Sequence, residues 1–150
     1  MEQIFKRIAE ESEGSNKVEG DRMYNLFAID IVLSFIRDAF ESYEADNRSE
    51  CVMMLRKMTQ LFSTRERFKD LVCLINVEND DRDFFVNISH IQLHRVTVGL
   101  NILREKVLGD SISHSNMAFL FMPLVKSVIM AAENVFYVDI YNCDFTFLDN

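Results

Sequence analysis

Apolar residues recur every three or four positions along most of this chain, and this spacing constrains its fold more than any other feature. The clearest case lies between residues 23 and 45, where Val32, Ile36 and Phe40 fall on one stripe and polar residues fill the opposite face. Residues that break helices are rare, since the 150 residues include one proline and four glycines. Long amphipathic helices are therefore expected, and the expected fold class is all-α.

Further helices follow from the same spacing. A short helix is expected over residues 2–10, and the glycine-containing stretch 10–21 is expected to be a loop. Beyond the first long helix, apolar stripes predict a helix that ends near Phe62 and another over residues 65–75.

Two more helices complete the chain. Residues 84–108 are expected to form one continuous helix with apolar residues on two sides, ended by Gly109. The last helix, over residues 117–131, contains Pro123. Because proline lacks a backbone N–H and clashes with the preceding turn, a kink or break is expected there.

Consecutive antiparallel helices joined by short polar loops allow two architectures. One is a HEAT-like α-solenoid segment, built from helix pairs over residues 22–62, 65–108 and 112–133. The alternative is a compact helical bundle. The expected organisation is an N-terminal short helix and loop (1–21), a HEAT-like helical repeat region (22–133) and an irregular aromatic tail (134–150).

The formal net charge of −8 bears on the partners of the chain. A free-standing domain that grips nucleic acid by its phosphates should be basic, so autonomous binding of RNA or DNA is disfavoured. A small basic strip, formed by Arg65, Arg67 and Lys69, is expected to be a solvated helix face. Three cysteines without a C-x-x-C pair indicate a reduced, intracellular protein. No apolar run is expected to span a membrane, which takes about 20 residues.

His90 and His94 stand four residues apart and would share one face of the expected helix. Zinc hydrolases with this spacing place a glutamate directly after the first histidine, but Ile91 stands there. Nothing marks Glu105 or Asp83 as the third ligand that a zinc site needs. The two histidines are therefore interpreted as part of a polar helix stripe, and neither a metal nor another cofactor is expected.

No other pattern predicts catalysis. The four glycines are too scattered for a loop that binds phosphate, and no Gly-x-Ser-x-Gly motif is present. Cys73 lies in an apolar run and is interpreted as a core residue rather than a nucleophile. We therefore expect no enzyme activity and no small-molecule substrate.

The run DFFVNISHIQLHR, residues 83–95, carries a family resemblance. With the following GLNILRE and the Met-Pro-Leu step at residues 122–124, it resembles the small nucleolar RNA-associated protein 20 family, also called down-regulated in metastasis. This family is a HEAT-repeat component of the small-subunit processome. The residues that match the family's run are Asp83, Phe84, Phe85, Asn87, His90, Ile91, Gln92, His94 and Arg95.

The resemblance implies a scaffold without catalytic activity that acts in pre-ribosomal RNA processing and ribosome biogenesis. Its location would be the nucleus and nucleolus, and its partners would be processome proteins and, indirectly, pre-ribosomal RNA. It also implies that Asp83 caps a helix, that Phe84 and Phe85 anchor it, and that His90 and His94 form hydrogen bonds between repeats.

Two alternatives to this function stay open. The first is a self-contained bundle that binds an amphipathic partner helix, which the eight methionines would suit. The second is a zinc-dependent enzyme that uses His90 and His94.

Overall fold

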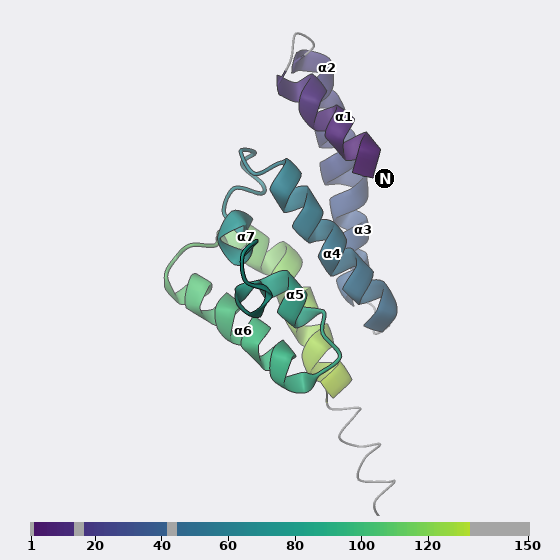
Figure 1. Cartoon of the computed structure of the whole chain (residues 1–150). Coiled ribbons are helices and arrows are strands. Elements are labelled where there is room, and N and C mark those ends of the chain that lie inside the picture. Colours follow the sequence, from purple (N-terminus) through teal and green to yellow (C-terminus); the bar gives the residue numbers. More distant parts are fainter. Residues whose placement is uncertain (1, 14–16, 42–44, 133–150) are drawn as a thin grey trace, which may run out of the picture.

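The computed structural model describes residues 2–13, 17–41 and 45–132, and every regular element within these ranges is helical (Figure 1). The prediction of an all-α fold is therefore confirmed. The aromatic tail expected over residues 134–150 lies outside the described residues. In chain order the elements are α1 (Glu2–Glu13), α2 (Lys17–Met23), the π-helix η1 (Tyr24–Leu33), α3 (Ser34–Glu41), α4 (Ala45–Leu61), the 3-10 helices η2 (Leu71–Leu74) and η3 (Asp80–Arg82), α5 (Phe84–Ile88), α6 (Leu93–Leu108), α7 (His114–Asn116) and the π-helix η4 (Met117–Phe121).

The first long helix begins earlier than its apolar spacing predicted. α1 continues to Glu13, and α2, η1 and α3 follow one another without a break from Lys17 to Glu41. The loop expected over residues 10–21 is therefore wrong on both sides of residues 14–16, which lie outside the described residues. Gly20, which indicated a loop in the sequence, is buried inside α2.

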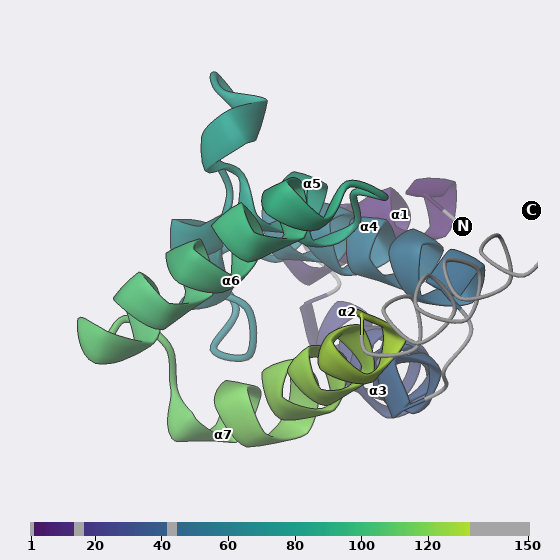
Figure 2. The same ribbon diagram turned by 90° about the horizontal axis from the view of Figure 1, so that it is seen from below.

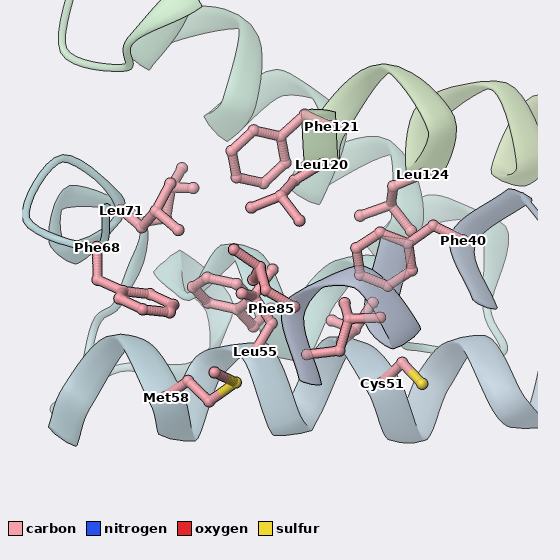
Figure 3. Packing of buried hydrophobic residues seen from close by; sticks show 14 of the residues in the cluster. Phe40, Cys51, Leu55, Met58, Phe68, Leu71, Phe85, Leu120, Phe121 and Leu124 are labelled. Atoms are coloured by element: carbon pink, nitrogen blue, oxygen red, sulfur yellow. The ribbon is translucent and has the colours of Figure 1, made fainter. Parts of the chain in front are cut away.

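The core lies where three segments that are distant in sequence meet. Phe40 of α3, Leu55 of α4 and Phe85 of α5 are completely buried. Figure 3 shows these side chains packed together with Phe121 and Leu124 from the last helix. The antiparallel pair α3–α4 is therefore covered on one side by α5 and by the last helix.

The last helix runs continuously from His114 to Ala132, so Pro123 does not break it. The π-helix η4 ends at Phe121, two residues before the proline, and its wider turns accommodate the clash and the missing donor of the proline. Figure 2 shows this helix beside α3. Two arginines fix its position: the Arg37 guanidinium lies 5.3 Å from the centre of the Phe119 ring, and Arg48 donates a 2.9 Å hydrogen bond to Ser127.

The same helix has the length and the apolar composition of a helix that could cross a membrane. The expectation that no segment has them is therefore wrong by length and composition. Lys126 is the only Lys, Arg, Asp or Glu within it. A core helix passes the same test, and Leu120, Phe121, Leu124 and Val128 are buried in the core described above. These four residues therefore pack within the chain, whereas Met122 and Ile129 of the same helix are 56% and 47% exposed.

The helix expected over residues 65–75 is largely replaced by turns. Backbone hydrogen bonds from Arg65 to Phe62, from Phe68 to Arg65 and from Leu71 to Phe68 each reach back three residues. A regular α-helix would reach back four. The apolar residues of this segment are nonetheless buried, namely Phe62, Phe68 and Leu71. Residues three positions apart fall on the same side of the chain in 3-10 turns as well as in an α-helix.

The helix expected over residues 84–108 is broken. α5 ends at Ile88, and α6 begins at Leu93 and folds back on α5 (Figure 1). The crossing is tight at Gly99, since a Cβ atom built there would lie 2.9 Å from the backbone nitrogen of Ile88. The expectation of apolar stripes covered on two sides is wrong for Ile91 and Val98, which are 98% and 37% exposed. Phe85, Ile88 and Leu103 of the same stripes are buried.

Gly109 ends α6 as the sequence predicted. It occupies the C-cap position, and its backbone N–H donates to the carbonyl of Glu105. The positive φ that usually accompanies such an end belongs to the next residue, Asp110, with φ 53°.

We expect the substitution Gly99→Ala to destabilise the protein. Alanine favours a helix by up to about 1 kcal/mol, but the added methyl group would overlap the Ile88 backbone, and overpacking costs about 1–3 kcal/mol. A net loss of about 1–2 kcal/mol is expected in urea unfolding. Asn101→Ala, at an exposed position of the same helix, is the control and should not lower stability. An equal or higher stability of Gly99→Ala would contradict the tight crossing.

Candidate functional site

The run of residues 83–95 divides into two halves with different environments. The first half forms α5 and its cap, and Asp83, Phe84, Phe85 and Asn87 are each 0% exposed. The second half forms the break and the first turn of α6, where Ile91 is 98% exposed. The first half therefore builds the fold, whereas the second half leaves side chains on the surface.

Asp83 joins three segments through its buried carboxylate. One oxygen accepts from the backbone N–H of Val86, which caps α5. The other accepts from the backbone N–H of Asn76, at 3.0 Å. That same oxygen forms an ion pair with the Arg56 guanidinium of α4, at 2.9 Å. The Arg56 side chain is 16% exposed, so the pair lies largely out of water and is hardly screened.

Asn87 and the two phenylalanines complete the buried half. The Asn87 amide donates to the backbone carbonyls of Asp80 and Asp83, at 2.8 and 2.7 Å. The Phe84 ring meets Phe85 and Phe121 edge to face, with centres 5.2 and 5.5 Å apart. Such aromatic pairs add about 0.5–1.5 kcal/mol to the burial of their area. α5 is only five residues long, and it is held by its cap, by the Asn87 amide and by these aromatic contacts.

The break between α5 and α6 separates the two histidines. His90 lies in the break, and its Nδ1 accepts from the backbone N–H of Gln92 at 3.0 Å. His94 is exposed on the first turn of α6. The prediction that both belong to one polar helix stripe is therefore wrong. Within residues 2–13, 17–41 and 45–132, no cluster of three or more His, Cys, Asp or Glu side chains could hold a metal ion.

Arg95, the last residue of the run, contacts the loop that precedes the run. It forms an ion pair with Asp81, whose side chain is 74% exposed, while Arg95 itself is only 20% exposed. On the other side of the break, the Ser49 hydroxyl donates to the carbonyl of Ser89, at 3.5 Å. Both contacts hold the break in place, so the exposed residues between them are presented on a fixed support.

Arg65, in the small basic strip, is committed to partners within the chain. It forms an ion pair with Asp21, at 2.7 Å, and lies 4.8 Å from the centre of the Tyr24 ring. Burial raises the pKa of Tyr24 to about 12, although the neighbouring arginines lower it. Tyr24 therefore stays neutral and offers its ring face to the cation.

The rest of the strip is engaged in the same way. Arg67 stacks on Phe119, with its guanidinium 4.8 Å from the ring centre, and Lys69 pairs with Glu66 at 2.7 Å. The expectation of a solvated helix face is wrong for the two arginines, because residues 62–70 form turns that place both on aromatic rings. Lys69, in contrast, is 55% exposed to solvent. Arg65 also pairs with Asp21, and Arg67 donates to the Ser115 hydroxyl, so both guanidinium groups have polar partners within the chain as well.

Cys73 was interpreted as a core residue, and it is partly buried against the core cluster. Its thiol donates to the carbonyl of Asp70 at 3.1 Å. Burial raises the pKa of the Cys73 thiol, so the reactive thiolate is scarcer at neutral pH than for a free cysteine.

Comparison with known proteins gives one relationship. No family model matches the chain. The sequence is 31% identical over 114 residues to U3 small nucleolar RNA-associated protein 20 of Saccharomyces cerevisiae. The two proteins are distantly related. The matched region makes up 74% of this chain but 4% of the yeast protein, so the relationship concerns a small segment of a much longer molecule. The resemblance drawn from residues 83–95 agrees with this relationship.

We expect Asp83→Ala to cost about 3–5 kcal/mol of stability, since it leaves the largely buried Arg56 without its ion-pair partner and removes a helix cap. The change would be measured as the free energy of unfolding in urea. The matched control is Asp80→Ala, because the Asp80 side chain is exposed and only its backbone carbonyl binds Asn87. The control should change stability by less than about 0.5 kcal/mol. Equal effects of the two substitutions would refute the role of the buried carboxylate.

The zinc hypothesis makes a separate prediction. Because a zinc site needs at least three protein ligands, and His90 and His94 lie on different segments, we expect far less than one zinc ion per chain. The protein would be dialysed against zinc and then buffer, and its metal content measured by mass spectrometry. The double variant His90→Ala, His94→Ala is the control and should hold the same trace amount. One tightly bound zinc that the double variant loses would restore the hypothesis.

Proposed function

We propose that this chain is a non-catalytic helical-repeat scaffold segment that acts in ribosome biogenesis. In this proposal it associates with proteins of the small-subunit processome in the nucleolus. The observation that carries the proposal is the relationship to U3 small nucleolar RNA-associated protein 20 over 114 residues. The activity of that whole protein is assigned to this chain only as part of the proposal.

The two halves of the run 83–95 support a scaffold. A stable helical platform is built by the buried half, while Ile91 projects from it with 98% of its surface exposed. An isoleucine at such a position contributes nothing to packing within the described part of the chain. Covering it with another protein would contribute about 1.5–3 kcal/mol. Ile91, with Gln92 and His94, is therefore the contact that we assign to a neighbouring repeat or processome protein.

The surface of α6 agrees with a repeat that packs against a neighbour. Gly99 and Leu103 are its buried residues, whereas Leu93, Val107 and Leu108, which share one side of the helix, are between 37% and 73% exposed. Helices in a solenoid bury such faces against the next repeat. This exposed apolar face supports the HEAT-like arrangement over the compact bundle.

Contact with pre-ribosomal RNA is indirect in this proposal. The chain carries a net charge of −8, which repels phosphate. The arginines of the basic strip are already stacked on Tyr24 and Phe119. RNA should therefore be recovered with the chain only through its protein partners.

The proposal predicts that Ile91→Asp separates the chain from processome proteins without unfolding it. Tagged chain would be expressed in the cells it comes from and recovered, and its associated proteins and RNA identified. Wild-type protein should enrich processome proteins and pre-ribosomal RNA, and Ile91→Asp should lower that enrichment about tenfold or more. Unfolding in urea should give the same midpoint for both.

Val77→Asp is the matched control, because Val77 is also a loop residue with 76% of its surface exposed. This variant should still recover processome proteins at the wild-type level. RNA that remains bound to the purified wild-type chain after its partner proteins are removed would refute indirect contact. Recovery of no processome protein with the wild-type chain would refute the proposed function itself.

A further inference from the structure

A second apolar surface lies on α1, α3 and α4, on elements that the run 83–95 does not include. A hollow of about 850 Å³ is lined by residues of these three helices. Its apolar lining consists of Phe5, Phe35, Ala39, Cys51, Met53 and Met54. We call this surface the methionine groove.

The methionine groove combines a firm floor with an adaptable wall. Phe5 and Cys51 are 3% and 4% exposed, so they form a packed floor. Phe35 stands at the edge with 59% of its surface exposed. Met53 and Met54 are partly exposed, and methionine side chains adjust to irregular apolar partners. Grooves of this composition between helices hold the apolar face of an amphipathic helix.

The charges at the rim decide which helix fits. Asp38 and Glu50 line the groove and are exposed. The basic residue of the rim, Lys57, already interacts within the chain. The whole protein carries a net charge of −8. A partner with lysine or arginine beside its apolar stripe would therefore be attracted, and an acidic partner would be repelled.

The same charges argue against two occupants from the protein itself. Residues 133–150 contain four acidic residues and no lysine or arginine, so Asp38 and Glu50 would repel that segment. A second copy of the chain would bring another net charge of −8. Both occupants contain apolar residues that could enter the groove, but neither has the net positive charge that would complement Asp38 and Glu50.

We propose that the methionine groove binds a basic amphipathic helix of a partner protein. The apolar stripe of that helix would lie on Phe35, Ala39 and the two methionines, and its cations would meet Asp38 and Glu50. This proposal does not depend on the role in ribosome biogenesis, since Ile91 lies outside the groove.

Full-length protein would be titrated into a fluorescent 18-residue probe peptide of leucine and lysine, with the leucines at helical three- and four-residue spacing. Binding would be followed by fluorescence anisotropy. We expect saturable binding that weakens as salt rises. A peptide of the same pattern with glutamate for lysine should bind at least tenfold more weakly. Equal binding of both peptides would overturn the charge argument.

Two pairs of variants locate the contact. Phe35→Gln should weaken binding of the lysine peptide at least fivefold, while Leu26→Gln should leave it unchanged. Leu26 is 56% exposed, lies on the adjoining η1 and does not line the groove. The double variant Asp38→Asn, Glu50→Gln should also weaken binding, whereas Glu78→Gln, Glu105→Gln removes the same charge from exposed positions elsewhere and should weaken it much less. Unchanged binding by Phe35→Gln would overturn the site.

The two rejected occupants have tests of their own. A synthetic peptide of residues 133–150 should not compete with the lysine peptide, and competition by it would assign the groove to that segment. Sedimentation should show no dimer that Phe35→Gln dissolves. Such a dimer would assign the groove to a second copy and overturn the proposal.

Discussion

The buried carboxylate of Asp83 is the interaction on which the arrangement of the second half of the chain depends. It holds Arg56 of α4, the backbone of Asn76 and the first turn of α5 at one point. A buried charge is tolerated only where its partners replace water, and here an ion pair and two backbone donors do so. Asp83 therefore ties the start of α5 to α4.

The surface of the chain follows from the same anchor. Because α5 is short and fixed at both ends, the chain must turn within four residues before α6 can begin at Leu93. That turn is locked by the ion pair of Arg95 with Asp81 and by the contact of Gly99 with Ile88. Ile91 is left at the outside of the turn. An apolar contact surface is therefore a consequence of how the buried half packs.

The two proposed contact surfaces differ in size, rigidity and charge. The Ile91 surface is small and apolar on a rigid support, which suits a neighbour of fixed shape. The methionine groove is larger and adaptable, and acidic residues border it, which suits a helix that is recognised by charge and apolar spacing rather than by exact fit. A scaffold that holds two partners at once could use one surface for each.

Much of the fold was determined by the sequence itself. The helical period predicted the all-α fold and the helices around Val32 and Phe62, because an amphipathic stripe must be buried wherever the chain folds. The aspartate before Phe84 is an N-cap residue by type, so that helix start could be predicted from local chemistry. The polar and apolar residues of the run 83–95 also indicated the relationship that the comparison supports.

Only the tertiary structure decided where helices are interrupted and which residues of the run stay exposed. The break at residues 89–92 has no proline and no glycine. It exists because Asp83 and the buried phenylalanines fix α5, while Gly99 lets α6 fold back on it. The turns at residues 62–70 could not be predicted from the sequence either, because a three-residue step fits both an α-helix and a 3-10 turn. Spacing along a chain records which residues are apolar, but long-range packing decides which of them are covered.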